Sequence, residues 1–293
     1  MNTSMNNPLA LFSTALADLV AATAPSIVEI ASHRSLASGF AWRENLVVTA
    51  DETLADSGEI LVELAGGEVR SATLVGRDPT TDIALLRVEG TPLAPVSFAA
   101  TAPRPGALAL AIGAAESAPL VALGAVATVG GAWRSMRGGE IAARIELDLR
   151  LRARGEGGLA LDPGEGAFGM TVLGPRRRAL VIPGATIDRV AALLLAHGHI
   201  PRGYLGLGLR EVAIDNEQAG AMVMAVEPGG PGAVAGLHQG DVITRWAGDP
   251  VGSVARLLHS LGPDSIGTHV RVGIRRGGQE SEAEIEVGER PRR

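Results

Sequence analysis

Reactive side chains are distributed unevenly along this sequence of 293 residues. It contains no cysteine and no lysine, so all 26 of its Lys and Arg residues are arginine. No serine occurs between Ser135 and Ser253, and no histidine between His33 and His197. These gaps exclude a thiolate nucleophile, a cysteine-ligated metal, a Schiff base and a Ser–Lys dyad. Because arginine stays protonated, it cannot replace lysine as a base. We expect no cofactor and no metal.

Composition narrows the function classes further. The net charge of −6 and the pI of about 5.6 argue against a nucleic-acid groove. Apolar residues make up 46% of the chain and aromatic residues only 3%, so aliphatic side chains must build the cores. The single basic run, from Arg176 to Arg178, is interpreted as a solvated loop.

No segment is predicted to span a membrane. The apolar stretch 105–133 carries only one charge, Glu116, but glycines interrupt it repeatedly, which is typical of buried strands and turns. The N-terminus lacks a basic region, and Asp18 interrupts its apolar residues, so it does not match a signal peptide. The chain by itself therefore predicts a cytoplasmic protein.

Two helices and about a dozen strands are predicted to position the candidate reactive side chains of the first 200 residues. Residues 9–24 have apolar side chains at helical spacing and stop at Pro25, and residues 184–198 predict a second helix closed by Gly198. Between these helices, short alternating segments predict about a dozen strands, typical of a β-sandwich or a pair of barrels. The predicted strands are 27–31, 39–42, 46–49, 60–64, 68–75, 83–88, 107–112, 120–129, 142–149, 158–161, 167–173 and 179–182.

A second, smaller unit follows a linker at 201–203. Strands are predicted at 204–209, 221–226 and 242–246, a helix at 253–261, and a closing hairpin that pairs 268–275 with 282–287. About 90 residues of this kind form one compact module.

The order of these pieces resembles the HtrA/DegP-like family, a trypsin-like double β-barrel followed by a C-terminal PDZ domain. The similarity rests on LADLVAATAPSIVEI (16–30), LVGRDPTTDIALLRV (74–88), ALVIPGATIDRVAALLLAHGHIPRGYLGLGL (179–209) and PGGPGAVAGLHQGDVITRWAGDPV (228–251), which together sample nearly the whole chain. The resemblance implies a mostly β fold with an N-terminal helical arm at 1–24, a trypsin-like domain at 25–200 and a PDZ domain at 203–290.

The same resemblance shows that the catalytic triad is incomplete. Such a protease needs a serine nucleophile, a histidine base and an aspartate that orients the histidine. Asp82 occupies the aspartate position, but Glu52 stands at the histidine position and Glu156 at the serine position. Arg154 stands where the family has the glycine of the oxyanion hole. The resemblance therefore predicts an enzyme fold without serine-protease chemistry.

Two alternatives remain open for these carboxylates. If Glu52, Asp82 and Glu156 converge, they would raise one another's pKa and form a residual or novel hydrolase, or hold a cation. In the other interpretation the cluster is the remnant of a site, neutralised by Arg152 and Arg154 on the same loop.

The PDZ-like module keeps more of its family pattern. In the family, a peptide adds as a strand to an edge strand, and its carboxylate meets backbone N–H groups of a glycine loop. Tyr204, Leu205, Gly206 and Leu207 resemble that loop and strand, with the amides of the last three as candidate donors. Val254, Leu257 and Leu258 on the facing helix are candidate groove residues, although each also fits ordinary core packing.

These features predict a catalytically inactive, HtrA-like pseudoprotease that binds protein C-termini or extended peptides and acts as a scaffold or regulator. Its family resemblance further implies a homotrimer, or a hetero-assembly with an active paralogue, and a periplasmic location as the alternative to the cytoplasm. A structural subunit whose groove is empty, or filled by its own chain, is a third possibility.

Overall fold

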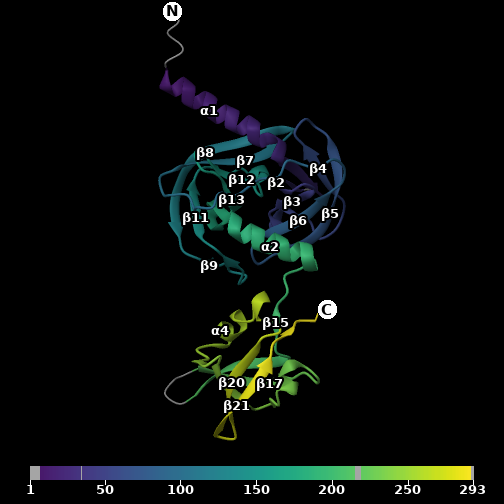
Figure 1. Cartoon of the computed structure of the whole chain (residues 1–293), viewed down its shortest axis with the longest axis vertical. Helices are drawn as coiled ribbons and strands as arrows, with labels where there is room; N and C mark the ends of the chain where they lie inside the picture. The colour runs from purple at the N-terminus through teal and green to yellow at the C-terminus, as the bar shows by residue number, and fades with distance from the viewer. Residues whose placement is uncertain (1–6, 34, 215–218, 292–293) are drawn as a thin grey trace, which may run out of the picture. The chain divides into compact units, whose positions relative to one another are not determined.

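A computed structural model of the chain describes residues 7–33, 35–214 and 219–291. The chain divides into two compact units, Met1–His199 and Ile200–Arg293, which are drawn in Figure 1.

Two closed six-stranded barrels make up the first unit, and this confirms the expected mostly β architecture. In spatial order, the first barrel consists of β1 (Ile27–Ser32), β2 (Ser35–Arg43), β3 (Leu46–Thr49), β6 (Ile83–Val88), β5 (Val69–Asp78) and β4 (Ile60–Leu64). The second consists of β11 (Arg144–Asp148), β14 (Ala179–Pro183), β13 (Gly166–Leu173), β12 (Leu159–Asp162), β7 (Leu108–Ala115) and β8 (Ala118–Gly130). A small ladder pairs β9 (Trp133–Arg134) with β10 (Glu140–Ile141).

Small aliphatic side chains fill both barrels, because the sequence offers few aromatic residues. Val62 and Leu86 are fully buried in the first barrel, and Ala109, Ile145 and Val181 are buried in the second. Between the barrels runs α2 (Gly184–His197), which Figure 1 shows packed beside them and which contacts β5, β6, β13 and β14. This helix ends at Gly198, as the sequence predicts.

The N-terminal helix α1 (Pro8–Thr23) has no buried residue. Leu9 is 77% exposed and Leu11 is 60% exposed, whereas Leu16, Leu19 and Val20 are half-buried, so the first half of the helix leaves its apolar side chains uncovered. Together with the 3₁₀ turn η2 (Ala24–Ser26), it forms a helix of 19 residues with a mean hydropathy of 1.4. By length and composition alone, this helix is apolar enough to cross a membrane, a test that a signal sequence near the N-terminus also passes.

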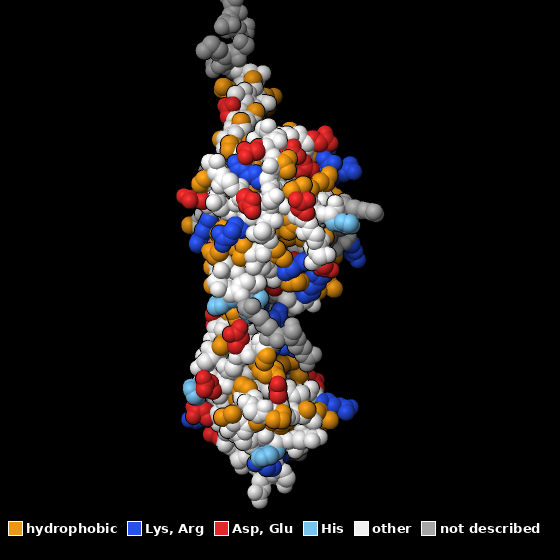
Figure 2. Space-filling view, turned by 90° about the vertical axis from the view of Figure 1, so that its right-hand side faces the viewer, with side chains coloured by type: hydrophobic (Ala, Val, Ile, Leu, Met, Phe, Trp, Pro, Cys, Tyr) orange, Lys and Arg blue, Asp and Glu red, His pale blue; other side chains and the backbone are white. Residues whose placement is uncertain are grey.

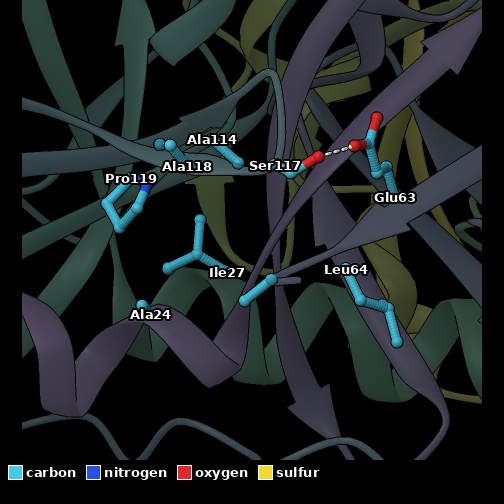
Figure 3. A pocket seen from close by; sticks show the side chains of 10 residues that line it. Ala24, Ile27, Glu63, Leu64, Ala114, Ser117, Ala118 and Pro119 are labelled. Carbon is cyan, nitrogen blue, oxygen red and sulfur yellow. Dashed lines mark hydrogen bonds between the residues drawn. The ribbon is translucent and has the colours of Figure 1, made fainter. Parts of the chain in front are cut away.

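A small crevice lies where η2 meets the barrels (Figure 3). Ala24 and Ile27 face Leu64 and Pro119 across it, and the Ser117 hydroxyl donates a hydrogen bond to Glu63 at its rim. Its volume of about 10 Å³ is enough for roughly one water molecule. This crevice is therefore too small to be a ligand site.

The second unit is built on one antiparallel sheet. Its strands, in spatial order, are β16 (Leu207–Ala213), β17 (Ala219–Val226), β18 (Val242–Trp246), β20 (His269–Arg276) and β21 (Gln279–Glu286), with β19 (Asp249–Pro250) paired to β18. Around it lie α3 (Pro231–Val234), α4 (Val254–His259), η7 (Pro263–Ser265) and the ladder of β15 (Gly203–Tyr204) with β22 (Gly288–Glu289). β16 is an edge strand of this sheet.

The buried carboxylate of Asp241 joins two elements of the second unit through hydrogen bonds. The side chain of Asp241 is 1% exposed and accepts hydrogen bonds from Nε and Nη2 of Arg276, at 2.7 and 2.8 Å. It also accepts one from the N–H of His238, at 2.7 Å. This network joins β20 to the turn before β18. On the face shown in Figure 2, charged and apolar side chains are mixed over both units.

Candidate functional site

The structure brings the three carboxylates of the expected triad positions together. Asp82 directly precedes β6 and has a left-handed backbone, with φ of 57°. Its Oδ1 accepts a hydrogen bond of 2.8 Å from the backbone N–H of Glu52, which lies in the 3₁₀ turn η3 (Asp51–Thr53). Glu156 follows the 3₁₀ turn η4 (Ala153–Gly155), and its Oε1 accepts a hydrogen bond of 2.9 Å from the N–H of Leu173.

Burial and mutual repulsion perturb two of these carboxyl groups. Burial raises the pKa of Asp82 to about 7, against the lowering effect of the Glu52 N–H, and the charges of Glu52, Glu156 and Asp51 raise it further. Burial also raises the pKa of Glu156, while the Leu173 N–H and Arg177 act in the opposite direction. A carboxyl group that titrates near neutral pH is suited to proton transfer.

One member of the cluster forms an ion pair outside it. Glu52 is exposed and pairs with Arg137 at 3.0 Å. Within the described ranges, no group of three or more His, Cys, Asp or Glu side chains is arranged to hold a metal ion. The cation version of the alternative hypothesis therefore has no geometric support.

Arg154 points away from the carboxylates. Its guanidinium pairs with Glu116 at 3.2 Å and lies 3.6 Å from Glu29. The interpretation that Arg152 and Arg154 neutralise Glu156 is therefore wrong. The arginine that acts electrostatically on Glu156 is Arg177, from a different loop. Sequence proximity was misleading because the loop turns at η4, so that the Arg154 side chain reaches Glu116 and Glu29 while Glu156 reaches the Leu173 N–H.

Two backbone N–H groups of the same loop donate hydrogen bonds within the loop itself. The N–H of Glu156 donates to the carbonyl of Ala153 at 3.1 Å, and the N–H of Gly155 donates to Arg152 at 2.8 Å. An oxyanion hole needs backbone N–H groups that point at the substrate. Here these two donors are used inside η4.

Gly157 anchors this loop against the first barrel, so replacing it with alanine is expected to destabilise the first unit by about 2–4 kcal/mol. Its φ is +82°, and a Cβ atom would lie 2.3 Å from the carbonyl oxygen of Ser38 and 2.6 Å from the Thr49 hydroxyl. Urea denaturation measures the loss. Gly164→Ala is the matched control, because its added Cβ meets only Asp162 Oδ1, at 3.5 Å, and it should be nearly neutral. Equal stabilities of the two variants would contradict this packing.

A second candidate site lies at the edge of the second unit. Gly206 has φ of +65°, and the carbonyl groups of Leu205 and Gly206 accept hydrogen bonds from Gly232 (2.7 Å) and Glu227 (2.8 Å). In the part of the chain that the structure describes, the N–H groups of Leu205 and Gly206 have no hydrogen-bond partner. A turn with its carbonyls engaged and its N–H groups free is suited to bind a carboxylate.

The apolar candidates around this loop divide into core and groove. Leu205 and Leu257 are each 3% exposed and belong to the core of the unit. Leu207 and Val254 pack only partly against that core, while Leu258 is 52% exposed. Val254 and Leu258 are four residues apart and share one face of α4. The structure thus leaves Leu207, Val254 and Leu258 available to a ligand.

Three further residues at this edge escaped the sequence reasoning. Leu209 follows Leu207 at a spacing of two on β16 and packs partly against the same core. Glu211 comes next at that spacing, and its carboxylate accepts a hydrogen bond of 3.1 Å from the N–H of Val254. Glu227 accepts a hydrogen bond from the Tyr204 hydroxyl. The alternation Leu207, Leu209, Glu211 was a readable signal for one strand face.

Comparison with known proteins agrees with the arrangement of both units. A family model of the trypsin-like peptidase domain matches residues 37–170, and a PDZ domain model matches residues 203–287. A probable periplasmic serine endoprotease, DegP-like, of Pseudomonas fulva is 31% identical over 274 residues, which cover 88% of this chain and 57% of that protein. The periplasmic pH-dependent serine endoprotease DegQ of Escherichia coli is 29% identical over 255 residues, covering 82% and 56%. The chain thus spans little more than half the length of these relatives.

Solved structures show the same fold. The serine endoprotease from Yersinia pestis superposes with a TM-score of 0.72 at 26% identity, covering 93% of this chain and 97% of that one. The HtrA-type protease AlgW with a tripeptide superposes with a TM-score of 0.69 at 25% identity, covering 94% and 98%.

These findings overturn the expected cytoplasmic location. The relatives named above are periplasmic proteins, and the helix formed by α1 and η2 has the length and apolar composition of a signal sequence. The sequence reasoning gave too much weight to Asp18. One carboxylate does not prevent a helix of 19 residues with a mean hydropathy of 1.4 from resembling an export signal.

Proposed function

The chain belongs to the HtrA-like family, in which a trypsin-like peptidase domain precedes a PDZ domain, and from this premise we propose that it is a pseudoprotease that binds protein C-termini. Its first unit keeps the barrels of a serine protease without the chemistry, and its second unit recognises peptides. The protein serves as a scaffold or regulator in the cell envelope, on its own, as a trimer or together with an active paralogue.

The observation that carries the loss of catalysis is the hydrogen bond between the Glu52 N–H and Asp82 Oδ1. This bond supports the assignment of Glu52 to the position of the catalytic base. In a serine protease the aspartate orients an imidazole by accepting its N–H, whereas an ionised carboxylate has no proton to donate to the aspartate. Glu156, at the position of the nucleophile, directs its carboxylate to the Leu173 N–H. Removing triad members lowers turnover by several powers of ten.

The free N–H groups at Leu205 and Gly206 support peptide binding, together with the position of β16 at a sheet edge. An extended peptide added to β16 would place its terminal carboxylate at these donors and its side chains against Leu207, Leu209 and α4. The AlgW neighbour, solved with a tripeptide, is consistent with a family that binds short peptides.

A casein assay tests the catalytic half of the proposal. We expect no turnover by the purified protein, and no change in the variant Glu156→Ala. Turnover that is lost in Glu156→Ala would contradict the proposal and favour the alternative, a hydrolase built on Glu52, Asp82 and Glu156. Trypsin-contaminated preparations are recognised because their activity does not depend on Glu156.

Binding of C-terminal peptides is expected to depend on Leu258. The variant Leu258→Glu places a charge on the exposed groove face of α4. It should lower the affinity for peptides selected from a C-terminal library by about tenfold or more. Fluorescence anisotropy measures the affinity. Ser281→Glu is the control, because Ser281 is exposed on β21, at the opposite edge of the sheet from β16. Failure of any free C-terminus to bind would favour a structural subunit instead.

A further inference from the structure

Two loops at one end of the second barrel concentrate positive charge. Residues 148–156 and 174–178 carry six arginines and only two carboxylates, in a chain whose net charge is −6. The loops are neighbours, because they leave the paired strands β11 and β14 at the register of Leu147 with Ala179. This charge lies beside Glu156, although the proposed function makes no use of it.

Internal ion pairs account for only part of this charge. Arg154 pairs with Glu116, and Arg178 pairs with Glu146 at 3.2 Å. The other four arginines, here named the arginine rim, are all exposed, and within the described ranges their side chains form no hydrogen bond and no ion pair: Arg150, Arg152, Arg176 and Arg177. Only Arg177 has an electrostatic partner, Glu156. A group of exposed like charges repels itself unless an anion from outside the molecule joins it.

An apolar groove adjoins two members of the rim. Arg150 and Arg152 border a hollow of about 230 Å³ whose other walls are formed by Ala111, Leu120, Val121, Ala122, Leu123, Leu151 and Gly155. Val121 is 41% exposed and Leu123 is 48% exposed. Both lie in the part of β8 that pairs with β7 alone, because β11 pairs only with residues 125–130 of β8. The exposed side chains of this segment form an apolar wall of the groove.

We propose that the arginine rim and this groove form a second binding site, for an acidic segment of a partner protein in which carboxylates flank an aliphatic side chain. The carboxylates pair with the unpaired guanidinium groups, which can bind them in a bidentate manner. The aliphatic side chain covers Val121 and Leu123 and removes their apolar surface from water.

The same features disfavour a nucleic acid at this site. Bound nucleic acids usually gain affinity from stacked bases, and the groove has no aromatic lining residue. Its aliphatic floor would remain exposed under a phosphate backbone. The site also lies in the first unit, so it does not depend on peptide capture by the second unit.

A labelled peptide of alternating glutamate and leucine, amidated at its C-terminus, tests the proposal on the full-length protein. Amidation removes the carboxylate that the loop at Gly206 would capture, so binding reports only the second site. We expect binding that weakens with salt and that falls about tenfold or more in the double variant Arg150→Glu/Arg152→Glu. A control double variant, Arg87→Glu/Arg104→Glu, changes two exposed arginines elsewhere in the first unit and should bind like the wild type.

Two further probes decide the class of ligand. A glutamate–serine peptide should bind more weakly than the glutamate–leucine peptide, because it leaves the groove unfilled. Equal binding of these peptides, or equal binding by the wild type and Arg150→Glu/Arg152→Glu, would overturn the proposal. So would a single-stranded oligonucleotide that binds more tightly than the acidic peptide and depends on the same two arginines.

Discussion

Replacing Asp82 with asparagine is expected to stabilise the first unit at pH 8 by about 2–4 kcal/mol and to flatten its dependence on pH. Burial raises the pKa of Asp82 to about 7 from its ordinary value of 3.8. The difference corresponds to at most about 4 kcal/mol, since one pKa unit is 1.36 kcal/mol. Asparagine keeps an oxygen that accepts the Glu52 N–H and removes the charge.

The sign follows from proton uptake. Between pH 3.8 and about 7 the folded protein holds a proton on Asp82 that the unfolded chain has released. The stabilising effect is therefore complete below the unfolded value and is lost as the pH rises through the folded value. The raised pKa of Glu156 adds an effect of the same sign. The wild-type first unit should resist urea better at pH 5 than at pH 8.

Urea denaturation followed by tryptophan fluorescence measures this effect. Trp246 is first changed to phenylalanine, so that Trp42 and Trp133 report on the first unit alone. The exposed turn residue Glu165 supplies the control Glu165→Gln, which should leave the pH profile unchanged. If Asp82→Asn keeps the wild-type slope between pH 5 and pH 8, the assignment of the proton to Asp82 is wrong.

Replacing Asp241 with alanine is expected to destabilise the second unit by about 2–4 kcal/mol. The change removes an acceptor of three hydrogen bonds and leaves the His238 N–H and the Arg276 guanidinium without it. Hydrogen exchange resolved by peptide should show faster exchange in β17 and β18, while the strands of the first unit keep their protection. Asp249→Ala, an exposed aspartate on β19, is the control and should change little.

The two units are expected to respond to acid in opposite directions. The hydrogen bonds from Arg276 hold the pKa of Asp241 below its usual range. Its contribution is present above pH 3.8 and is lost as the pH falls through the lowered value. Acidification below about pH 4 should therefore accelerate exchange in the second unit first. Exchange that accelerates first in the barrels would contradict both assignments.

Residue types alone predicted much of the candidate site. The aligned motifs indicated carboxylates, Glu52 and Glu156, where the resemblance expects an imidazole and a hydroxyl, and our proposal of an inactive site rests on these residues. The convergence of Glu52, Asp82 and Glu156 also followed, because the family topology brings their loops together. The direction of the Arg154 side chain did not follow, since neighbouring loop residues can reach different partners.

In the second unit, too, some features of the candidate groove could be predicted from the sequence and others could not. Its glycine loop and facing helix were readable, because Gly206 and the apolar spacing of α4 are local features. The sequence did not show that Leu257 is buried while Leu258 is exposed, because a rotation of one residue along a helix decides whether a leucine faces the core or the solvent. The exposure of α1 could not be predicted for the same reason. Periodicity shows that the helix has an apolar face, but only the neighbouring elements decide whether that face is covered.

The sequence by itself determined the architecture, the order of the two domains and the presence of carboxylates at positions 52 and 156, because these depend on residue identity and on patterns within single elements. Only the tertiary structure decided which charges are paired, which are buried and which are left over. The pKa of Asp82 and the unpaired arginine rim are properties of loops that are distant in sequence and adjacent in space. Electrostatic interactions depend on such distances and on burial, and neither is written in a local pattern.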